Sequence, residues 1–138
     1  MTLQVELVSP ERILYSGEAD IVIARTVGGG EIAFLTGHAP FVGALDIATV
    51  TIRPPSGSGG HDEVVAVHGG FVEVSGDTVT ILSDVAELAS QIDVERAREA
   101  AEEAEKKVQQ DHNVEAEGAA RRAHVRLAAA GGVASTAH

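Results

Sequence analysis

The chain has 138 residues, of which 44% are hydrophobic and only 3% aromatic, with no Trp and no Cys. This length suits one compact domain with an appendage, and the absence of Cys excludes disulfides, thiolate metal sites and a cysteine nucleophile. With 10 Lys and Arg against 21 Asp and Glu, the formal net charge of −11 argues against a nucleic-acid-binding protein, whose contact surface must be basic.

The first ten residues (MTLQVELVSP) contain neither a basic segment nor a long apolar run, so they do not have the pattern of a signal peptide. Nowhere do eighteen apolar residues follow one another, so no membrane span is expected. We therefore expect a soluble protein on the cytoplasmic side, with no direct insertion into a membrane.

Short apolar runs separated by turn residues fill the first part of the chain. The runs lie at residues 3–7, 21–27, 31–35, 47–52, 63–67, 71–74 and 78–82. The segment 54–62 (PPSGSGGHD) has the composition of a flexible hairpin loop. Short strands at close spacing, with Gly-rich turns and no helical pattern between them, predict an antiparallel sandwich or barrel. We assign residues 1–90 to a β-sandwich domain.

From residue 91 onward the apolar residues follow the period of a helix. Two stripes recur at three- and four-residue steps: Val94, Ala97, Ala101, Ala104 and Val108, then Ala116, Ala120, Ala123, Leu127 and Ala130. Each stripe is typical of one helix face. The pattern predicts an antiparallel two-helix hairpin over residues 91–132, so the fold class is mainly β with an α-helical appendage.

Residues that favour caps and turns mark the ends of both predicted helices. Asp93 precedes the first stripe as a candidate N-cap, and residues 111–113 (DHN) favour a turn between the stripes. Gly131 and Gly132 supply a stop signal after the second stripe. We expect the remaining tail, residues 133–138, to be disordered.

The two helices are expected to meet along alanine. Alanine is the best helix former, but it buries little area, and hydrophobic burial contributes only about 0.8 kcal/mol per methylene-sized group. Strong helices with a weak mutual contact suit an element that docks in one state and extends in another. A short helical appendage without such a role is the alternative interpretation.

Four segments occur in an order and spacing that resemble one protein family. They are VSPER with YSG at residues 8–17, GEIAFLTGHAP at 30–40, HGGFVEV at 68–74 and VTILSDVAE at 79–87. Together they resemble the epsilon subunit of bacterial F-type ATP synthase, which is equivalent to the mitochondrial delta subunit. The resemblance covers residues 3–130 and departs from the family pattern at Thr36, where Pro is common, and at Ala33, where Gly is common.

The resemblance implies a non-catalytic subunit of the central stalk, peripheral to the cell membrane on its cytoplasmic side. Its partners would be the gamma subunit and the c-ring, so that it couples proton-driven rotation to ATP synthesis. Its hairpin would extend into the alpha/beta catalytic head and inhibit ATP hydrolysis. Glu31 and His38 would lie at the contacts with the ring and the stalk.

A second part of the resemblance concerns a regulatory ATP site, although no cofactor is required. Residues 92–97 (IDVERA) and 122–127 (RAHVRL) are similar to segments that bind ATP in some members of the family. The residues carried over are Glu87, Asp93, Arg96, Ala97, Arg122 and Arg126. Guanidinium groups grip phosphate oxygens in bidentate fashion. The alternative is that Asp93 is only an N-cap and that the arginines form a solvated face or a contact for the catalytic head.

Two other classes of function fit the sequence less well. His38, His61 and His68 with Glu31 and Glu63 could be assembled into a metal site, but the spacing of a metal-binding motif is missing, as are a nucleophile elbow and a phosphate-binding loop. We therefore expect neither catalytic nor metal-ligating residues. A generic β-sandwich adaptor would explain the two structural units, but it would not explain the ordered segments.

Overall fold

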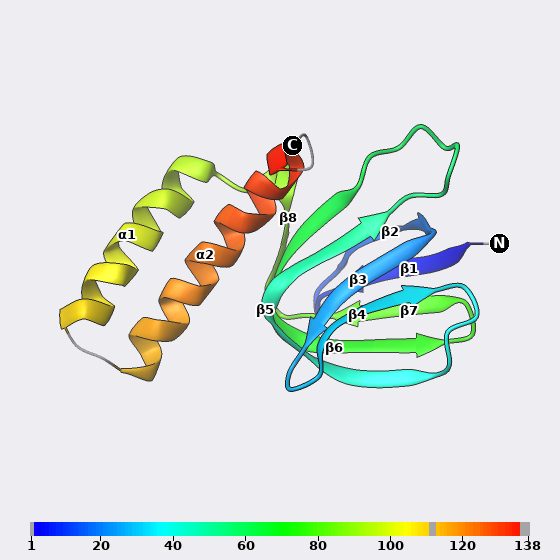
Figure 1. The fold of residues 1–138 in the computed structure, drawn as a ribbon, viewed down its shortest axis with the longest axis horizontal. Coiled ribbons are helices and arrows are strands. Elements are labelled where there is room, and N and C mark those ends of the chain that lie inside the picture. Colours follow the sequence, from blue (N-terminus) through cyan, green and yellow to red (C-terminus); the bar gives the residue numbers. More distant parts are fainter. Residues whose placement is uncertain (1, 111–112, 136–138) are drawn as a thin grey trace.

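The computed structural model describes residues 2–110 and 113–135, with side chains described as far as residue 130. Eight strands come first along the chain and two helices follow (Figure 1). The strands are β1 (Leu3–Val8), β2 (Ile13–Ala19), β3 (Ile21–Thr26), β4 (Gly30–Leu35), β5 (Phe41–Arg53), β6 (Glu63–Ser75), β7 (Thr78–Leu82) and β8 (Ala86–Leu88). A 3-10 turn, η1 (Ala89–Gln91), then leads to the helices α1 (Val94–Gln110) and α2 (Val114–Ser135).

The strands form one sheet in the order β2-β1-β7-β6-β5-β3-β4, with β8 beside β6. The sheet folds over at the bends of β5 and β6 to make the two layers of a sandwich (Figure 1). The predicted β-sandwich followed by two helices is confirmed. Among the described pairs, β1 and β7 run parallel and the others are antiparallel.

The bend of β6 depends on two glycines. Gly69 and Gly70 have φ of +85° and +124°, which residues with a Cβ rarely adopt. This backbone lets β6 bend between the layers while it stays paired with β5 on both sides of the bend. The predicted strands 63–67 and 71–74 are therefore the two halves of one strand of 13 residues, not two strands joined by a turn.

The inner faces of the two layers enclose an aliphatic core. Its largest fully buried side chains are Phe34, Leu3, Leu7, Ile52, Ile81, Val5, Val22, Val50, Val65, Val67, Val72 and Val74. Every second residue of β1 is buried, the alternation expected of a strand with one face on the core. As far as the structure describes the helices, none of their residues belongs to this core. The sandwich is therefore a folding unit with its own interior.

Side-chain caps begin both helices. The Oδ1 atom of Asp93 accepts a hydrogen bond from the backbone N–H of Arg96 at 3.1 Å, which confirms the predicted N-cap. Asn113 caps α2 in the same way through the N–H of Ala116 at 2.7 Å. The predicted turn at residues 111–113 lies partly outside the described residues.

The predicted end of the second helix is wrong. α2 continues through Gly131 and Gly132 to Ser135, because glycine inside a helix costs only about 1 kcal/mol relative to alanine and does not forbid it. Residues 133–135 of the predicted tail are therefore helical, and residues 136–138 lie outside the described part of the chain.

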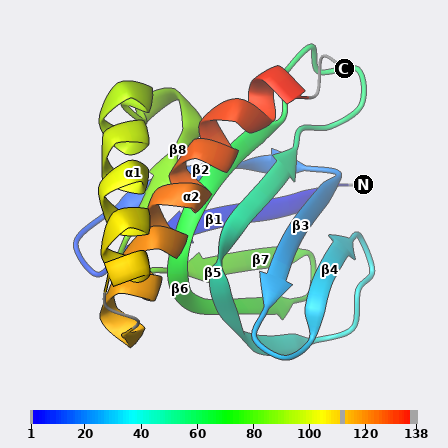
Figure 2. The same cartoon turned by 60° about the vertical axis from the view of Figure 1, so that its left-hand side comes forward.

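The helix α2 lies between α1 and the sandwich (Figures 1 and 2). α1 packs on α2 through its buried Ala97, Ala101 and Ala104, which confirms the alanine face predicted for the first helix. α2 in turn packs on β5 and β6. Within the described residues, no helix has the length and hydrophobicity to cross a membrane.

Candidate functional site

The contact between α2 and the sandwich is a small apolar cluster separate from the main core. Its buried residues are Val64, Ala66, Ile92, Ala97, Val125 and Ala129. Val125 and Ala129 lie outside the predicted stripe, so α2 has a second apolar face that this stripe does not include. Because five of these six residues are alanine or valine, the buried area is modest and the docking free energy is small.

Two ion pairs reinforce this contact, and each joins an acid of the sandwich to an arginine of α2. The Nη2 atom of Arg121 lies 2.6 Å from Oδ1 of Asp46 in β5. The Nε atom of Arg126 lies 2.6 Å from Oε1 of Glu87 in β8. Burial acts to raise the pKa of Asp46, but the N–H of Ile47 and the charge of Arg121 outweigh it, and the pKa is lowered.

A buried histidine lies behind the second ion pair. The side chain of His68 in β6 is only 3% exposed, and its Nε2 lies 3.5 Å from Oε1 of Glu87. Neither ring nitrogen has a hydrogen-bond partner. Burial lowers the pKa of His68, and the charges of Arg126 and Arg122 lower it further, whereas Glu87 acts in the opposite direction. In the sequence, His68 stands out only as part of the HGGFVEV segment and as a candidate metal ligand.

A cleft of about 400 Å³ opens beside the Arg126–Glu87 ion pair, between the start of α1 and the later part of α2. It is lined by Glu87, Gln91, Ile92, Asp93, Arg96, Ala97, Ala100 and Arg126. The structure thus brings together five of the six residues predicted for a nucleotide site. The cleft offers two guanidinium groups and two carboxylates, and one of those carboxylates already caps α1.

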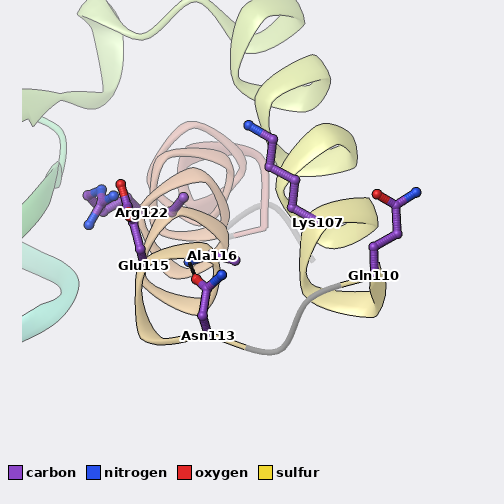
Figure 3. A pocket seen from close by; sticks show the side chains of 7 residues that line it. Lys107, Gln110, Asn113, Glu115, Ala116 and Arg122 are labelled. Carbon is purple, nitrogen blue, oxygen red and sulfur yellow. Dashed lines mark hydrogen bonds between the residues drawn. The ribbon is translucent and has the colours of Figure 1, made fainter.

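The sixth predicted residue, Arg122, lines a different hollow of about 480 Å³ near the turn between the helices. Figure 3 shows Lys107 and Gln110 reaching from α1, opposite Asn113 and Ala116 at the start of α2. Arg122 and Arg126 are four residues apart, which is about 6 Å along a helix. That separation places them at different openings although they share one side of α2.

The two predicted partner-binding residues lie toward opposite ends of β4. Glu31 is exposed at the start of the strand, opposite Arg25 of β3. His38 lies in the loop after the strand, where its ring contacts Phe34 and Phe41 edge-on, with centroid distances of 5.0 Å and 6.3 Å. The structure does not gather Glu31 and His38 into one cluster.

A row of apolar residues crosses the outer surface of five strands. The strand registers place Ala44, Phe71, Leu82, Val8 and Ile13 side by side in that order. Phe71 is 57% exposed, Leu82 44% and Ile13 60%. We call these five residues the apolar row. Contiguous exposed apolar side chains of this kind mark protein contact surfaces.

The row was missed in the sequence because its members come from five separate strands. Its one local signal is Phe71, which points outward while its neighbour Val72 and then Val74 point into the core. Among the residues with described side chains, no group of three or more His, Asp or Glu is arranged to hold a metal ion.

Comparisons with known proteins match the chain to one family. The family model described as "ATP synthase, Delta/Epsilon chain, beta-sandwich domain" matches residues 2–89. The ATP synthase epsilon chain of Halalkalibacterium halodurans is 46% identical over 135 residues, covering 94% of this chain and 98% of that one. The epsilon chain of Brevibacillus brevis is 49% identical over 106 residues, or 77% of each chain.

The epsilon chain of Streptomyces griseus is 45% identical over 128 residues, covering 92% of this chain and 94% of that one. A chain in the structure of the Euglena gracilis mitochondrial ATP synthase, which contains OSCP, F1 and the c-ring, has a TM-score of 0.70 at 22% identity. The match spans 99% of this chain and 82% of the Euglena chain. That likeness supports the fold, while the closer sequence relatives confirm the resemblance found in the sequence.

Proposed function

The chain belongs to the ATP synthase delta/epsilon family, and from this we propose that it joins the rotor of the synthase and regulates it through its hairpin. As an epsilon chain it is a non-catalytic subunit of the complex that makes ATP. The sandwich transmits rotation between the gamma subunit and the c-ring, and the hairpin restrains ATP hydrolysis when it leaves the sandwich.

The apolar row is the surface that we assign to the contact with gamma. Phe71, Leu82 and Ile13 are large apolar side chains held on a rigid sheet, and such side chains provide much of the binding energy of protein contacts when a partner buries them. Glu31 and His38, in and beside β4, remain the candidates for the contact with the c-ring.

The row can be tested with the gamma subunit of the same organism in a pull-down. Phe71→Asp should abolish or strongly weaken the complex, because a carboxylate would be buried among apolar groups. Val114→Asp is the matched control, since Val114 is 86% exposed at the start of α2, away from the row. Equal retention of gamma by both variants would exclude the row as the contact.

The limited contact between the hairpin and the sandwich supports a regulatory role. α1 packs chiefly on α2, and α2 is held by a small apolar cluster and two partly exposed ion pairs. The main core contains none of the described helix residues. The hairpin can therefore leave while the sandwich stays folded.

Deletion of the chain after Asp93 tests this role in the reconstituted enzyme. The truncated protein should keep its sandwich and support coupled ATP synthesis, but hydrolysis should no longer be restrained. Unchanged hydrolysis relative to the full-length chain would remove the inhibitory role from the proposal.

We also propose that the cleft beside the ion pair takes ATP as a regulatory ligand. Its volume lies within the range of small-molecule sites, roughly 300–1,000 Å³, and Arg96 and Arg126 provide the donors that phosphate oxygens require. A nucleotide bound between α1 and α2 would stabilise the docked hairpin by mass action. ATP would thus act as a signal and not as a substrate.

A thermal-shift measurement in millimolar ATP checks this proposal. The wild-type chain should be stabilised, and Arg96→Ala should weaken binding by roughly tenfold or more, from the loss of about 1.5–3 kcal/mol of charge-assisted contact. Arg96 is a sharper test than Arg126, which also pairs with Glu87. Arg98→Ala is the control, because Arg98 is exposed and lines neither opening. Absence of any shift in the wild-type chain would end the proposal.

A further inference from the structure

His68 occupies a position that depends on the docked hairpin. The alternation of β6 places it on the same face as Val64 and Ala66, which belong to the cluster under α2. Its side chain is 3% exposed, and both ring nitrogens lack a hydrogen-bond partner. Its one polar contact within the described part of the chain is with Glu87, at 3.5 Å from Nε2, and a buried polar ring without a normal hydrogen bond is uncommon and needs an explanation.

The charges around the ring come from the elements that pack on it. Glu87 of β8 lies 3.5 Å from Nε2, but its Oε1 is already engaged by Nε of Arg126 at 2.6 Å. Arg126 and Arg122 of α2 both act against a proton on His68. On β5, Asp46 is held by Arg121. A proton on His68 would therefore place a second cation beside the Glu87 carboxylate, which already pairs with Arg126, at a site with little access to water.

We propose that His68 is a proton-controlled latch: while its ring is neutral the hairpin stays docked, and protonation of the ring releases α2 from the sandwich. Release removes Arg126 and Arg122 from the ring and lets water hydrate the imidazolium, so the charged form is favoured in the released state. The latch goes beyond the proposed function, because it requires neither a nucleotide nor another subunit.

The direction of the pH dependence follows from the two states. In the docked state burial and the two arginines hold the pKa of His68 below its ordinary value, which is about 6.5. In the released state the pKa returns to about 6.5. Docking is therefore at full strength above pH 7 and weakens as the pH falls below about 6.5. The ratio of docked to released hairpin changes by up to about tenfold per pH unit until the docked form itself takes up the proton.

Pulsed EPR on the full-length chain without nucleotide can measure this ratio. The chain has no Cys, so Ser75→Cys in β6 and Glu102→Cys in α1, both exposed, provide two unique spin-label sites. Between pH 8 and pH 5.5 the population at the docked distance should fall severalfold. His68→Gln should remove this pH dependence, whereas His61→Gln, in the exposed loop after β5, should leave it intact. A pH response that survives His68→Gln, or no response in the labelled wild-type chain, would overturn the proposal.

A second measurement is independent of the substitution and of its effect on folding. NMR titration of the His68 ring in the wild-type chain should give a midpoint below the ordinary histidine pKa of about 6.5. A midpoint at or above about 6.5 would overturn the latch. Neither measurement involves ATP or gamma, so failure of the latch is distinct from failure of the proposed function.

Discussion

Removal of the Arg126 guanidinium should loosen the hairpin without unfolding the sandwich. The Arg126–Glu87 pair is short, at 2.6 Å, and its side chains are 30% and 31% exposed. Charge-assisted hydrogen bonds contribute about 1.5–3 kcal/mol, and fully exposed ion pairs about 0–1 kcal/mol. A pair of intermediate exposure should contribute about 1–2 kcal/mol, which corresponds to a change of about 5- to 30-fold in an equilibrium constant.

Hydrogen exchange of the α2 amides reports this change, because α2 frays and exchanges more readily once it has left the sandwich. In Arg126→Ala these amides should exchange about 5- to 30-fold faster, while the amides of the sandwich core keep their protection. Arg98→Ala is the matched control, since Arg98 lies 3.9 Å from Glu95 and both side chains are more than half exposed. Exchange in α2 that rises equally in both variants would refute the role given to Arg126.

A double-mutant cycle with Glu87→Ala separates the pair from other effects of the substitutions. The coupling free energy should be about 1–2 kcal/mol in favour of docking, since the two side chains are in direct contact. Additive effects of Arg126→Ala and Glu87→Ala would contradict the assignment of this free energy to the pair.

Three further substitutions, two of them with matched controls, test the fold of the sandwich and the docking of α2. Gly70→Ala should lower the free energy of unfolding by at least about 2 kcal/mol in chemical denaturation. Its φ is +124°, and a Cβ there would overlap the last carbonyl of β7. Gly57→Ala is the control and should lower the free energy of unfolding less, because Gly57 has φ +83° but lies in open space. Phe34→Ala should cost about 3–5 kcal/mol, since Phe34 is fully buried, whereas Phe71→Ala should stay within about 0.5 kcal/mol. Ala129→Leu should overpack the contact under α2, destabilising docking by about 1–3 kcal/mol, and thus speed exchange in α2 but not in the sandwich.

Sequence patterns predicted those elements whose structure depends on residues close together in the sequence. The alternation of β1, the alanine face of α1 and the N-cap at Asp93 all follow from periods of two or 3.6 residues and from capping chemistry. The family resemblance added the ordered segments, and the five residues that line the cleft came from that resemblance.

Local patterns could not reveal features that depend on pairing across the chain. β2 was not assigned, because Ser16, Gly17 and Glu18 interrupt its apolar pattern, although it pairs with β1 along its length. The Gly69-Gly70 pair gave a turn signal, but pairing with β5 continues through the bend. The burial of His68 depends on α2, and the apolar row is contiguous only because five separate strands pair side by side.

The proposed role of the hairpin can be tested by tethering it to the sandwich. Cysteines at Asp46 and Arg121, whose side chains meet at the surface, can be bridged by a cleavable bismaleimide in a chain that has no other Cys. Hydrolysis by the reconstituted synthase would then be measured before and after cleavage of the tether. We expect the tethered subunit to leave hydrolysis unrestrained and cleavage to restore the restraint. Equal restraint in both states would show that undocking of the hairpin has no part in regulation.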